Sequence, residues 1–569
     1  MEDPDRGELA RRDFLKVTTG ATAALGLPAI QGAKAAEPTG PYNVILVITD
    51  QESHRLLAGA DYRLPARDAL ARRGISFEQH YIAAAMCTPS RGAMFSGQPP
   101  QVNGVFDQME LGYVPSLSTE RPSLGTVMKE LGYATAYYGK FELLRDIITP
   151  SDQVNYTDAL KAYGFDHFAP DGDKVGAPDQ GYDTDTYTAA AAVRWMRTNG
   201  RKLNAKGQPW FLVVSFVSPH DIMYADANIG GQRVQASKIG ATITPPPDNR
   251  LFQADWRFPL SPSHGDAIDG PGRPPAQMQY HLGWSDFLGE IPDDRDDMWR
   301  LFYTYYLNLI RDNDRNLQML LDAFDELDLW RNSVVVRTAD HGELAGSHGG
   351  LRGKGPFPYE EMAHVPLVIA HPAHSGGQSC RALTSHIDLL PTLVGLTGRP
   401  DASRVTGGLP GRDASRLLAG AALAAPDALR PGVLFNYVGL QTVDADYLAY
   451  IACKSIVEGR WVPPLAKTHP DLSKRGFIDF TFDGRYKYTR YYAPAAFNRP
   501  STLDEILAHN DIELFDLQAD PFERNNLALE PKTNEATILR LNALLNQLID
   551  QEVGIDDGRF LPAPVRPGG

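Results

Sequence analysis

The chain has 569 residues, a length that one hydrophobic core rarely fills, so we expect at least two structural units. Hydrophobic residues make up 43% and charged residues 22%, proportions that exclude a polytopic membrane protein and a mainly disordered chain. A net charge of −15 argues against a nucleic-acid binder, so any anionic ligand would need a local basic pocket. The three cysteines are too few for a disulfide scaffold.

The N-terminus carries an export pattern. Residues 11–16 match a twin-arginine motif of the R-R-x-F-L-K type, an apolar stretch follows at 17–30, and residues 33–35 offer an A-x-A cleavage site. The apolar stretch is too short to span a bilayer stably. We therefore expect residues 1–35 to be a twin-arginine signal peptide read by the twin-arginine translocase. The mature chain is then expected to be periplasmic or secreted, without a membrane span.

Five short runs of apolar, β-branched or aromatic residues predict buried strands of a parallel sheet. Helical patterns lie between them, for example at residues 123–131 and 298–327. This alternation predicts an α/β fold in which helices sandwich a mostly parallel central sheet. The five runs are residues 44–48, 134–138, 210–216, 333–337 and 366–370.

Polar residues follow four of these runs directly. Asp50 follows the first, Lys140 the second, His220 the third, and Asp340-His341 the fourth. In open α/β sheets ligands bind outside the carboxyl ends of the strands. The sequence therefore predicts an active site at that edge of the sheet.

After about residue 430 the pattern changes. Residues 477–482 and 486–491 predict antiparallel strands joined at Asp483-Gly484, a hairpin signal. A helix with one apolar stripe is expected around residues 538–548. We predict a catalytic α/β domain at residues 40–430 and a smaller α+β subdomain at residues 431–569.

The segment C-T-P-S-R-G at residues 87–92 is the most informative of the chain. Cys87 precedes a helix-like run ending at Phe95-Ser96-Gly97, so its side chain is expected at a helix N-terminus, which favours anions. Arg91 adds a guanidinium group suited to a tetrahedral oxyanion.

This segment resembles the C-x-P-S-R motif of the type I sulfatases, within the alkaline phosphatase superfamily, in which the Cys is oxidised enzymatically to formylglycine. The matching residues are Cys87, Pro89, Ser90 and Arg91. Further segments resemble family landmarks in the family's order: residues 43–50, 139–140, 218–220, 340–343, 353–367, 388–392 and 513–517. The resemblance covers most of the mature chain and implies the sulfatase fold.

The resemblance implies a sulfuric ester hydrolase acting on a small-molecule or carbohydrate sulfate ester. A formylglycine hydrate at position 87 carries two hydroxyls: one attacks sulfur to form a covalent sulfo-enzyme intermediate, and the other expels sulfate. An unmodified Ser would be trapped as a stable ester. A formylglycine-generating or sulfatase-maturing enzyme is therefore an expected partner.

The resemblance also implies a role for each site residue. Hard oxygen ligands favour Ca²⁺ at the metal site, and the imidazole of His341 leaves Mn²⁺ open. Arg91, Lys140 and Lys354 are expected to clamp the sulfate, and His220 to protonate the leaving oxygen. For His348 and His364 we expect structural roles. The expected metal ligands are Asp50, Gln51, the modified residue at Cys87, Asp340 and His341.

The sequence departs from the family pattern at two places. Gln51 stands where the family usually has Asp, and Phe141-Glu142 stands where it usually has Trp-His. A carboxylate facing a sulfate would repel it. Our hypothesis is that Glu142 binds a part of the substrate or points elsewhere.

Two other functions stay open. Gln51 and His341 favour a phosphonate monoester or phosphodiester hydrolase of the same superfamily, whereas Ser90 favours a sulfatase. Glu142 alone supports a non-catalytic, sulfate-binding pseudoenzyme. We interpret residues 486–490 as a solvated strand, with a glycan-binding strip as the alternative, and Cys380 and Cys453 as a pair that can bond or stay free.

Overall fold

The computed structural model describes residues 41–148, 155–169, 172–174, 176–256, 258–456 and 469–563. These belong to one packed unit that spans residues 40–569, so the predicted domain boundary near residue 430 stays a prediction. The predicted signal peptide lies outside the described residues. Among the helices that are described, none has the length and apolar character needed to cross a bilayer.

An eight-stranded sheet forms the centre of the molecule, in the order β5-β4-β6-β1-β7-β8-β2-β9. Each of the five predicted strands is present, and the predicted class, a mostly parallel sheet between helices, is confirmed. The strands are β1 (Asn43–Asp50), β2 (Ile75–Phe77), β4 (Ala134–Gly139), β5 (His167–Ala169), β6 (Trp210–Pro219), β7 (Ser333–Ala339), β8 (Leu367–Ala370) and β9 (Gln378–Cys380).

The direction of β8 differs from the sequence-based expectation, because it pairs antiparallel with both β7 and β2. A parallel connection needs a crossover that returns the chain to the far edge of the sheet. Here residues 340–366 stay at the carboxyl edge of β7, where they form short helical turns. The chain therefore re-enters the sheet from the edge at which it left.

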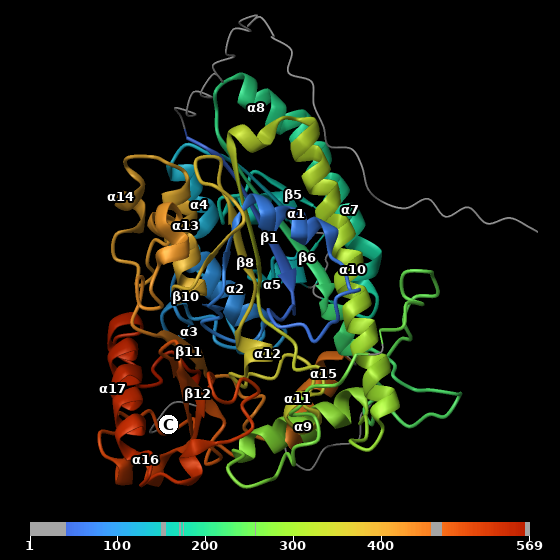
Figure 1. Ribbon diagram of the computed structural model, residues 1–569, viewed down its shortest axis with the longest axis vertical. Coiled ribbons are helices and arrows are strands. Elements are labelled where there is room, and N and C mark those ends of the chain that lie inside the picture. The colour runs from blue at the N-terminus through green and yellow to red at the C-terminus, as the bar shows by residue number, and fades with distance from the viewer. Residues whose placement is uncertain are drawn as a thin grey trace, which may run out of the picture. The chain divides into compact units, whose positions relative to one another are not determined.

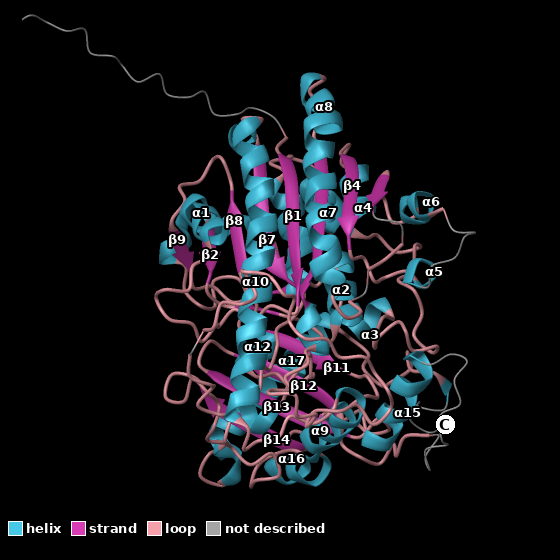
Figure 2. Ribbon diagram, turned by 90° about the vertical axis from the view of Figure 1, so that its right-hand side faces the viewer, coloured by secondary structure: helices cyan, strands magenta, loops and turns pink. Residues whose placement is uncertain are grey.

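Helices cover both faces of the sheet (Figure 2). On one face, Leu70, Ala189 and Leu317 pack against Ile45 of β1; they belong to α1 (Pro65–Arg73), α7 (Gln180–Trp195) and α10 (Asp296–Glu326). The other face carries α2 (Cys87–Ser96), α4 (Leu124–Glu130) and α13 (Leu389–Leu396). Successive side chains of β1 alternate between the two cores, as a strand buried on both faces requires.

The described residues also contain two short strands and eleven further α-helices. Two small strands, β3 (His80–Tyr81) and β10 (Thr384–Ser385), pair with each other. The remaining α-helices are α3 (Pro100–Asn103), α5 (Arg145–Ile148), α6 (Tyr156–Lys161), α8 (Arg201–Ala205), α9 (Pro275–Leu288), α11 (Ser347–Gly350), α12 (Glu360–Ala363), α14 (Ala402–Thr406), α15 (Ala445–Ile456), α16 (Leu503–His509) and α17 (Glu535–Glu552).

A second, antiparallel sheet follows in the C-terminal part, shown in orange and red in Figure 1. It consists of β11 (Val433–Tyr437), β12 (Phe477–Phe482), β13 (Tyr486–Tyr492) and β14 (Asp511–Asp516). The predicted hairpin is β12–β13. The predicted apolar stripe, including Ile538, Leu541 and Leu545, lies on α17 and packs against Leu434 and Leu514.

The interpretation of residues 486–490 as a solvated strand is wrong, and the same burial argues against a glycan-binding strip. Tyr488 and Arg490 lie under α17, where Arg490 donates to Asn542. Lys487 points to the opposite face and pairs with Glu360 of α12. Both faces of β13 are therefore covered, a feature that its polar sequence does not indicate.

Candidate active site

The carboxyl ends of four neighbouring strands bring the predicted polar residues together. Asp50 ends β1, Lys140 follows β4, His220 follows β6, and Asp340 and His341 follow β7. All five side chains are buried. The expectation that these residues meet at one edge of the sheet is confirmed.

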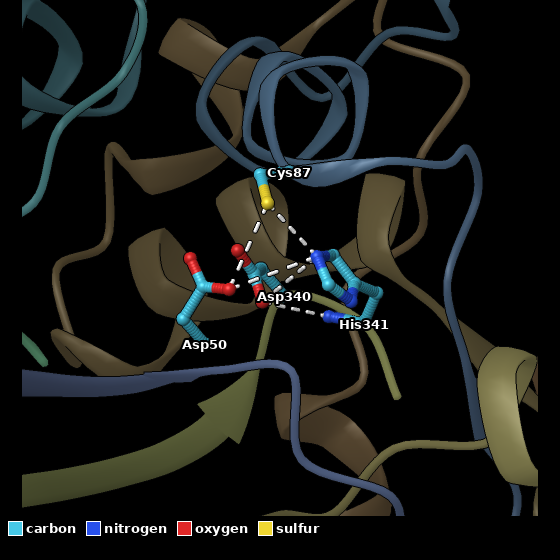
Figure 3. A group of neighbouring side chains, drawn as sticks. All are labelled: Asp50, Cys87, Asp340 and His341. Atoms are coloured by element: carbon cyan, nitrogen blue, oxygen red, sulfur yellow. Dashed lines mark hydrogen bonds and ion pairs between the residues drawn. The ribbon is translucent and has the colours of Figure 1, made fainter. Parts of the chain in front are cut away.

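Cys87 is the first residue of α2, and its sulfur points toward Asp50, Asp340 and His341 (Figure 3). Its Sγ atom lies 3.0 Å from Nε2 of His341 and 3.7 Å from Oδ1 of Asp50. Lys354 Nζ lies 2.8 Å from the same sulfur. The cysteine thus faces both the carboxylate–imidazole cluster and a lysine.

The donor atoms of this cluster suit a cation. One ligand atom from each of Asp50, Cys87, Asp340 and His341 lies within 4.8 Å of the others. Gln51 adds a buried Oε1 that has no hydrogen-bond partner among the described residues. The amide nitrogen of Gln51 donates to Glu343, which orients the carbonyl oxygen away from that carboxylate. Oxygen and imidazole donors around an unpartnered carbonyl fit a divalent cation.

Asp50 and His341 are in the ionisation states that bind a cation, whereas Asp340 keeps a proton that a bound cation would displace. Burial disfavours the charge on Asp50, but Lys140, His220 and Arg91 hold the pKa of this carboxyl well below its usual range. Burial and the charge on Asp50 raise the pKa of Asp340 to about 8. Burial lowers the pKa of His341 to about 3, which keeps the imidazole in the neutral form that binds metals.

Most of the hydrogen-bond donors of Arg91 are used by neighbouring residues of the protein. Its Nε donates to Asp340 Oδ2 at 2.9 Å and its Nη2 to Asp50 Oδ2 at 3.0 Å. Its Nη1 donates to the backbone of Lys140 and to Ser215. Because a guanidinium has five N–H donors, these contacts leave one for a ligand. Arg91 therefore orients both carboxylates, and its predicted contact with sulfate stays a prediction.

Glu142 lies behind Lys140. Lys140 Nζ is 2.6 Å from Asp50 Oδ2 and 2.7 Å from Glu142 Oε2. The other carboxylate oxygen of Glu142 accepts from Thr88 Oγ1 at 2.9 Å. These contacts favour the second half of the hypothesis, that Glu142 points elsewhere, and its predicted substrate contact stays a prediction. Phe141, the other departure, fills an aromatic cluster with Tyr137.

His220 and Lys354 form a pair at the opposite side of Cys87. Nζ of Lys354 lies 2.9 Å from Nε2 of His220. Burial and the charge on Lys354 hold the pKa of His220 well below its usual value. Nδ1 of His220 has no hydrogen-bond partner among the described residues. Gly176 packs against this ring so closely that a Cβ there would lie 2.2 Å from Nδ1.

Three buried carboxylates support the site: Glu343, which belongs to the family landmark at residues 340–343 but was given no role of its own, and Asp185 and Asp173, which the sequence did not indicate. Glu343 accepts from Gln51 and from the backbone of Gly353, beside Lys354. Asp185 accepts the backbone N–H groups of Val217 and Ser218, just before His220. Asp173 likewise accepts from the backbone of Phe141 and Glu142. Asp185 and Asp173 meet the site only through long-range folding, and sequence spacing carries no signal for that, whereas Glu343 lies within the family landmark at residues 340–343.

Two further sequence predictions have mixed outcomes. Cys380 is a buried thiol, but the side chain of Cys453 lies outside the described residues, so their pairing is untested. His364 Nδ1 donates a hydrogen bond to Glu360 Oε2 at 2.8 Å, which is a structural role. His348 Nε2 contacts Glu361 Oε2 at 3.1 Å, within a second cluster of buried polar side chains.

A family model described as Sulfatase matches residues 42–399. An ulvan-active sulfatase from Formosa agariphila is 24% identical over 528 residues, 90% of this chain and 81% of that protein. A delta 4,5-hexuronate-2-O-sulfatase from Bacteroides thetaiotaomicron is 24% identical over 510 residues, 88% of this chain and 86% of that protein. An extracellular sulfatase Sulf-1 homolog from Caenorhabditis elegans is 23% identical over 382 residues, 64% of this chain, which spans only 48% of that relative.

Solved structures show the same fold. The phosphonate monoester hydrolase of Agrobacterium radiobacter has a TM-score of 0.63 at 21% identity, covering 90% of this chain and 96% of that chain. A 2-O GAG sulfatase has a TM-score of 0.60 at 21% identity, covering 92% of this chain and 94% of that chain. At this identity the likeness establishes the fold alone.

Proposed function

The chain belongs to the sulfatase family, and from this premise we propose that it hydrolyses sulfate monoesters through formylglycine made from Cys87 and a covalent sulfo-enzyme intermediate. The observation that carries the proposal is the position of Cys87 Sγ, 3.0 Å from His341 Nε2 and 2.8 Å from Lys354 Nζ. In this structure Sγ stands in for a hydroxyl oxygen of the hydrated formylglycine. An unmodified thiol is a poor nucleophile here, because burial and Asp50 raise the pKa of Cys87 well above its usual value.

The hydrate would supply two hydroxyls on one carbon, one to attack sulfur as the alcohol leaves and one to expel sulfate and restore the aldehyde. A divalent cation, when bound, would lower the pKa of the attacking hydroxyl and neutralise sulfate oxygens. Asp50, Gln51, Asp340 and His341 would hold it with residue 87. Their oxygen donors favour Ca²⁺, while the imidazole leaves Mn²⁺ open.

The chain's own cations would bind and activate the ester. Lys354 Nζ, 2.8 Å from Sγ, is placed to contact a sulfate oxygen, with Lys140 and the free donor of Arg91 on the other side. His220 would protonate the leaving oxygen, with Lys354 as its hydrogen-bond partner. The depressed pKa of His220 means that the bound anion must first raise it before the imidazole can act as an acid.

Mass spectrometry of the peptide containing Cys87, from protein made in the native host, tests the modification. We expect an aldehyde or its hydrate in place of the thiol, and a thiol retained at Cys380 in the same digest as the control. Cys87→Ser incubated with an aryl sulfate is expected to gain one stable sulfate group. An intact thiol at Cys87 would contradict both this function and the phosphonate alternative.

The phosphonate monoester or phosphodiester hydrolase is the second candidate, and the neutral Gln51 among the ligands favours it. A sulfate monoester, a phosphonate monoester and a phosphodiester each carry one negative charge at neutral pH, so a metal site with one carboxylate fewer repels each of them less and total charge does not separate them. Rates of one preparation on an aryl sulfate, an aryl phosphonate and an aryl phosphodiester decide between them. A faster phosphonate rate would reverse the assignment.

The export and maturation of the protein complete the proposal. The twin-arginine motif at residues 11–16 supports transport of a folded chain, which allows a maturing enzyme to modify Cys87 before export. A periplasmic or secreted enzyme would meet small-molecule or carbohydrate sulfate esters outside the cytoplasm. Replacing both arginines by lysines should retain the protein in the cytoplasm, measured by cell fractionation.

A further inference from the structure

A second cluster of buried polar side chains is separate from the metal-ligand candidates around Cys87. It consists of His348 in α11, Glu361 in α12 and Glu523, which follows β14. One ligand atom from each lies within 4.8 Å of the others. All three residues are buried, at 0%, 8% and 1% exposure.

The charges in this cluster are not balanced by the lysine beside it. Lys487 Nζ lies 2.8 Å from Glu360 Oε1, 2.8 Å from Glu523 Oε1 and 2.7 Å from the carbonyl of Pro358. An ammonium group has three donors, so these contacts use all of them and none reaches Glu361. Lys487 therefore pairs with Glu360 and Glu523 and leaves Glu361 without an ammonium partner.

Glu361 supplies an independent sign of a missing partner. Its Oε2 contacts His348 Nε2 at 3.1 Å, but its Oε1 has no hydrogen-bond partner among the described residues. An unpartnered buried carboxylate oxygen is costly. Nearby Arg55 donates to the carbonyl of Pro521, and Arg273 to Tyr359 and Asp266.

We propose that His348, Glu361 and Glu523 form a second site for a divalent transition-metal cation, with Zn²⁺ as the best match. Imidazole nitrogen and carboxylate oxygen are both donors that Zn²⁺ takes in proteins, and water would complete its four-coordinate shell. A divalent cation would supply the partner that Glu361 Oε1 lacks, and Lys487 would keep Glu360 as its partner.

The site would be structural. Glu361 of α12 is bonded to the loop that follows β7, since its carbonyl accepts from Glu343 N and from Ser53 Oγ. In the sequence, His348 lies between the active-site residue His341 and Lys354. Glu523 comes from the C-terminal part of the chain. A cation there would tie the C-terminal segment to the loops that carry His341 and Lys354.

The site is tested by measuring the number of Zn²⁺ ions bound per chain after the mature protein, without the predicted signal peptide, is loaded with Zn²⁺. We expect Glu361→Gln to bind one Zn²⁺ fewer per chain than the wild type. Glu513→Gln is the matched control, since Glu513 is also buried but bonds to Tyr359 and Tyr491. The control should keep the wild-type content. Equal Zn²⁺ content in Glu361→Gln and the wild type would overturn the proposal.

Two measurements keep the test decisive if Glu361→Gln fails to fold. Wild-type crystals soaked in Zn²⁺ should show an anomalous peak at the zinc edge between the three side chains, and its absence would refute the site. In solution, Zn²⁺ should raise the unfolding temperature of Asp340→Asn, in which the site at Cys87 has lost a ligand. No shift in that variant would also contradict a second site.

Discussion

Oε2 of Glu142 lies 2.7 Å from Nζ of Lys140, and both side chains are buried. Because the same ammonium is 2.6 Å from Asp50 Oδ2, the lysine is held between two carboxylates. Glu142, which stands where the family usually has His, is therefore an ion-pair partner of Lys140. Because the ammonium neutralises its charge, the carboxylate need not repel a bound sulfate. A buried ion pair with a second hydrogen bond, here to Thr88, fixes position more than it adds stability.

Glu142→Gln should therefore lower kcat/KM by a similar factor, about tenfold, on every sulfate ester, because it loosens Lys140 without removing a substrate contact. Glu142→His, which restores the family residue, is expected to preserve the ranking of substrates as well. The measurement is the rate on sulfate esters of uncharged alcohols and on sulfate esters whose alcohol part carries a positive charge. A selective loss on cationic esters would establish the substrate contact that the sequence suggested.

Most of the site could be predicted from the sequence because four of its residues lie at or just after the end of a predicted strand. Asp50, Lys140, His220 and Asp340 follow apolar runs whose carboxyl ends must share an edge in a parallel sheet. Cys87 was predictable at a helix start from the residues after it. These inferences need only local pattern and one topological rule.

The remainder depends on packing between distant segments. The burial of Lys487 follows from α17 and Glu360 closing on both faces of β13. The antiparallel direction of β8 follows from the path of the loop before it. No periodicity encodes these contacts, so the polar sequence of β13 predicted solvent exposure.

Glu343 should control metal affinity through Gln51. In Glu343→Gln the partner of Gln51 becomes an amide that can also accept through its oxygen or donate through its nitrogen, so the carbonyl of Gln51 is no longer oriented. We expect metal affinity at the Cys87 site to fall about 10- to 100-fold, measured by Ca²⁺ titration calorimetry. In a Gln51→Ala background the same change should have no further effect. Additive losses in the double variant would refute the coupling.

Gly176 should be required for the position of His220. Its φ is +92° and a Cβ would lie 2.2 Å from His220 Nδ1, so Gly176→Ala must move the ring. We expect kcat to fall about 100-fold, and more for esters with poor leaving groups, because proton donation then limits the rate. Gly230→Ala is the control: its φ is +64° with no atom within 4 Å of the added carbon. Equal kcat in both variants would mean that His220 tolerates the shift.

Asp185 should make stability depend on pH. Burial raises its pKa to about 8, against a usual value of 3.8, despite hydrogen bonds from Val217 and Ser218. Between these two values the folded state keeps a proton that the unfolded state has lost, so this group's contribution to the free energy of unfolding falls as pH rises. The slope is at most about 1.4 kcal/mol per pH unit. Asp185→Asn cannot titrate, so its free energy of unfolding should rise relative to the wild type from pH 5 to pH 8. Denaturant titrations at several pH values give this difference, and a constant difference would show that Asp185 is ionised throughout.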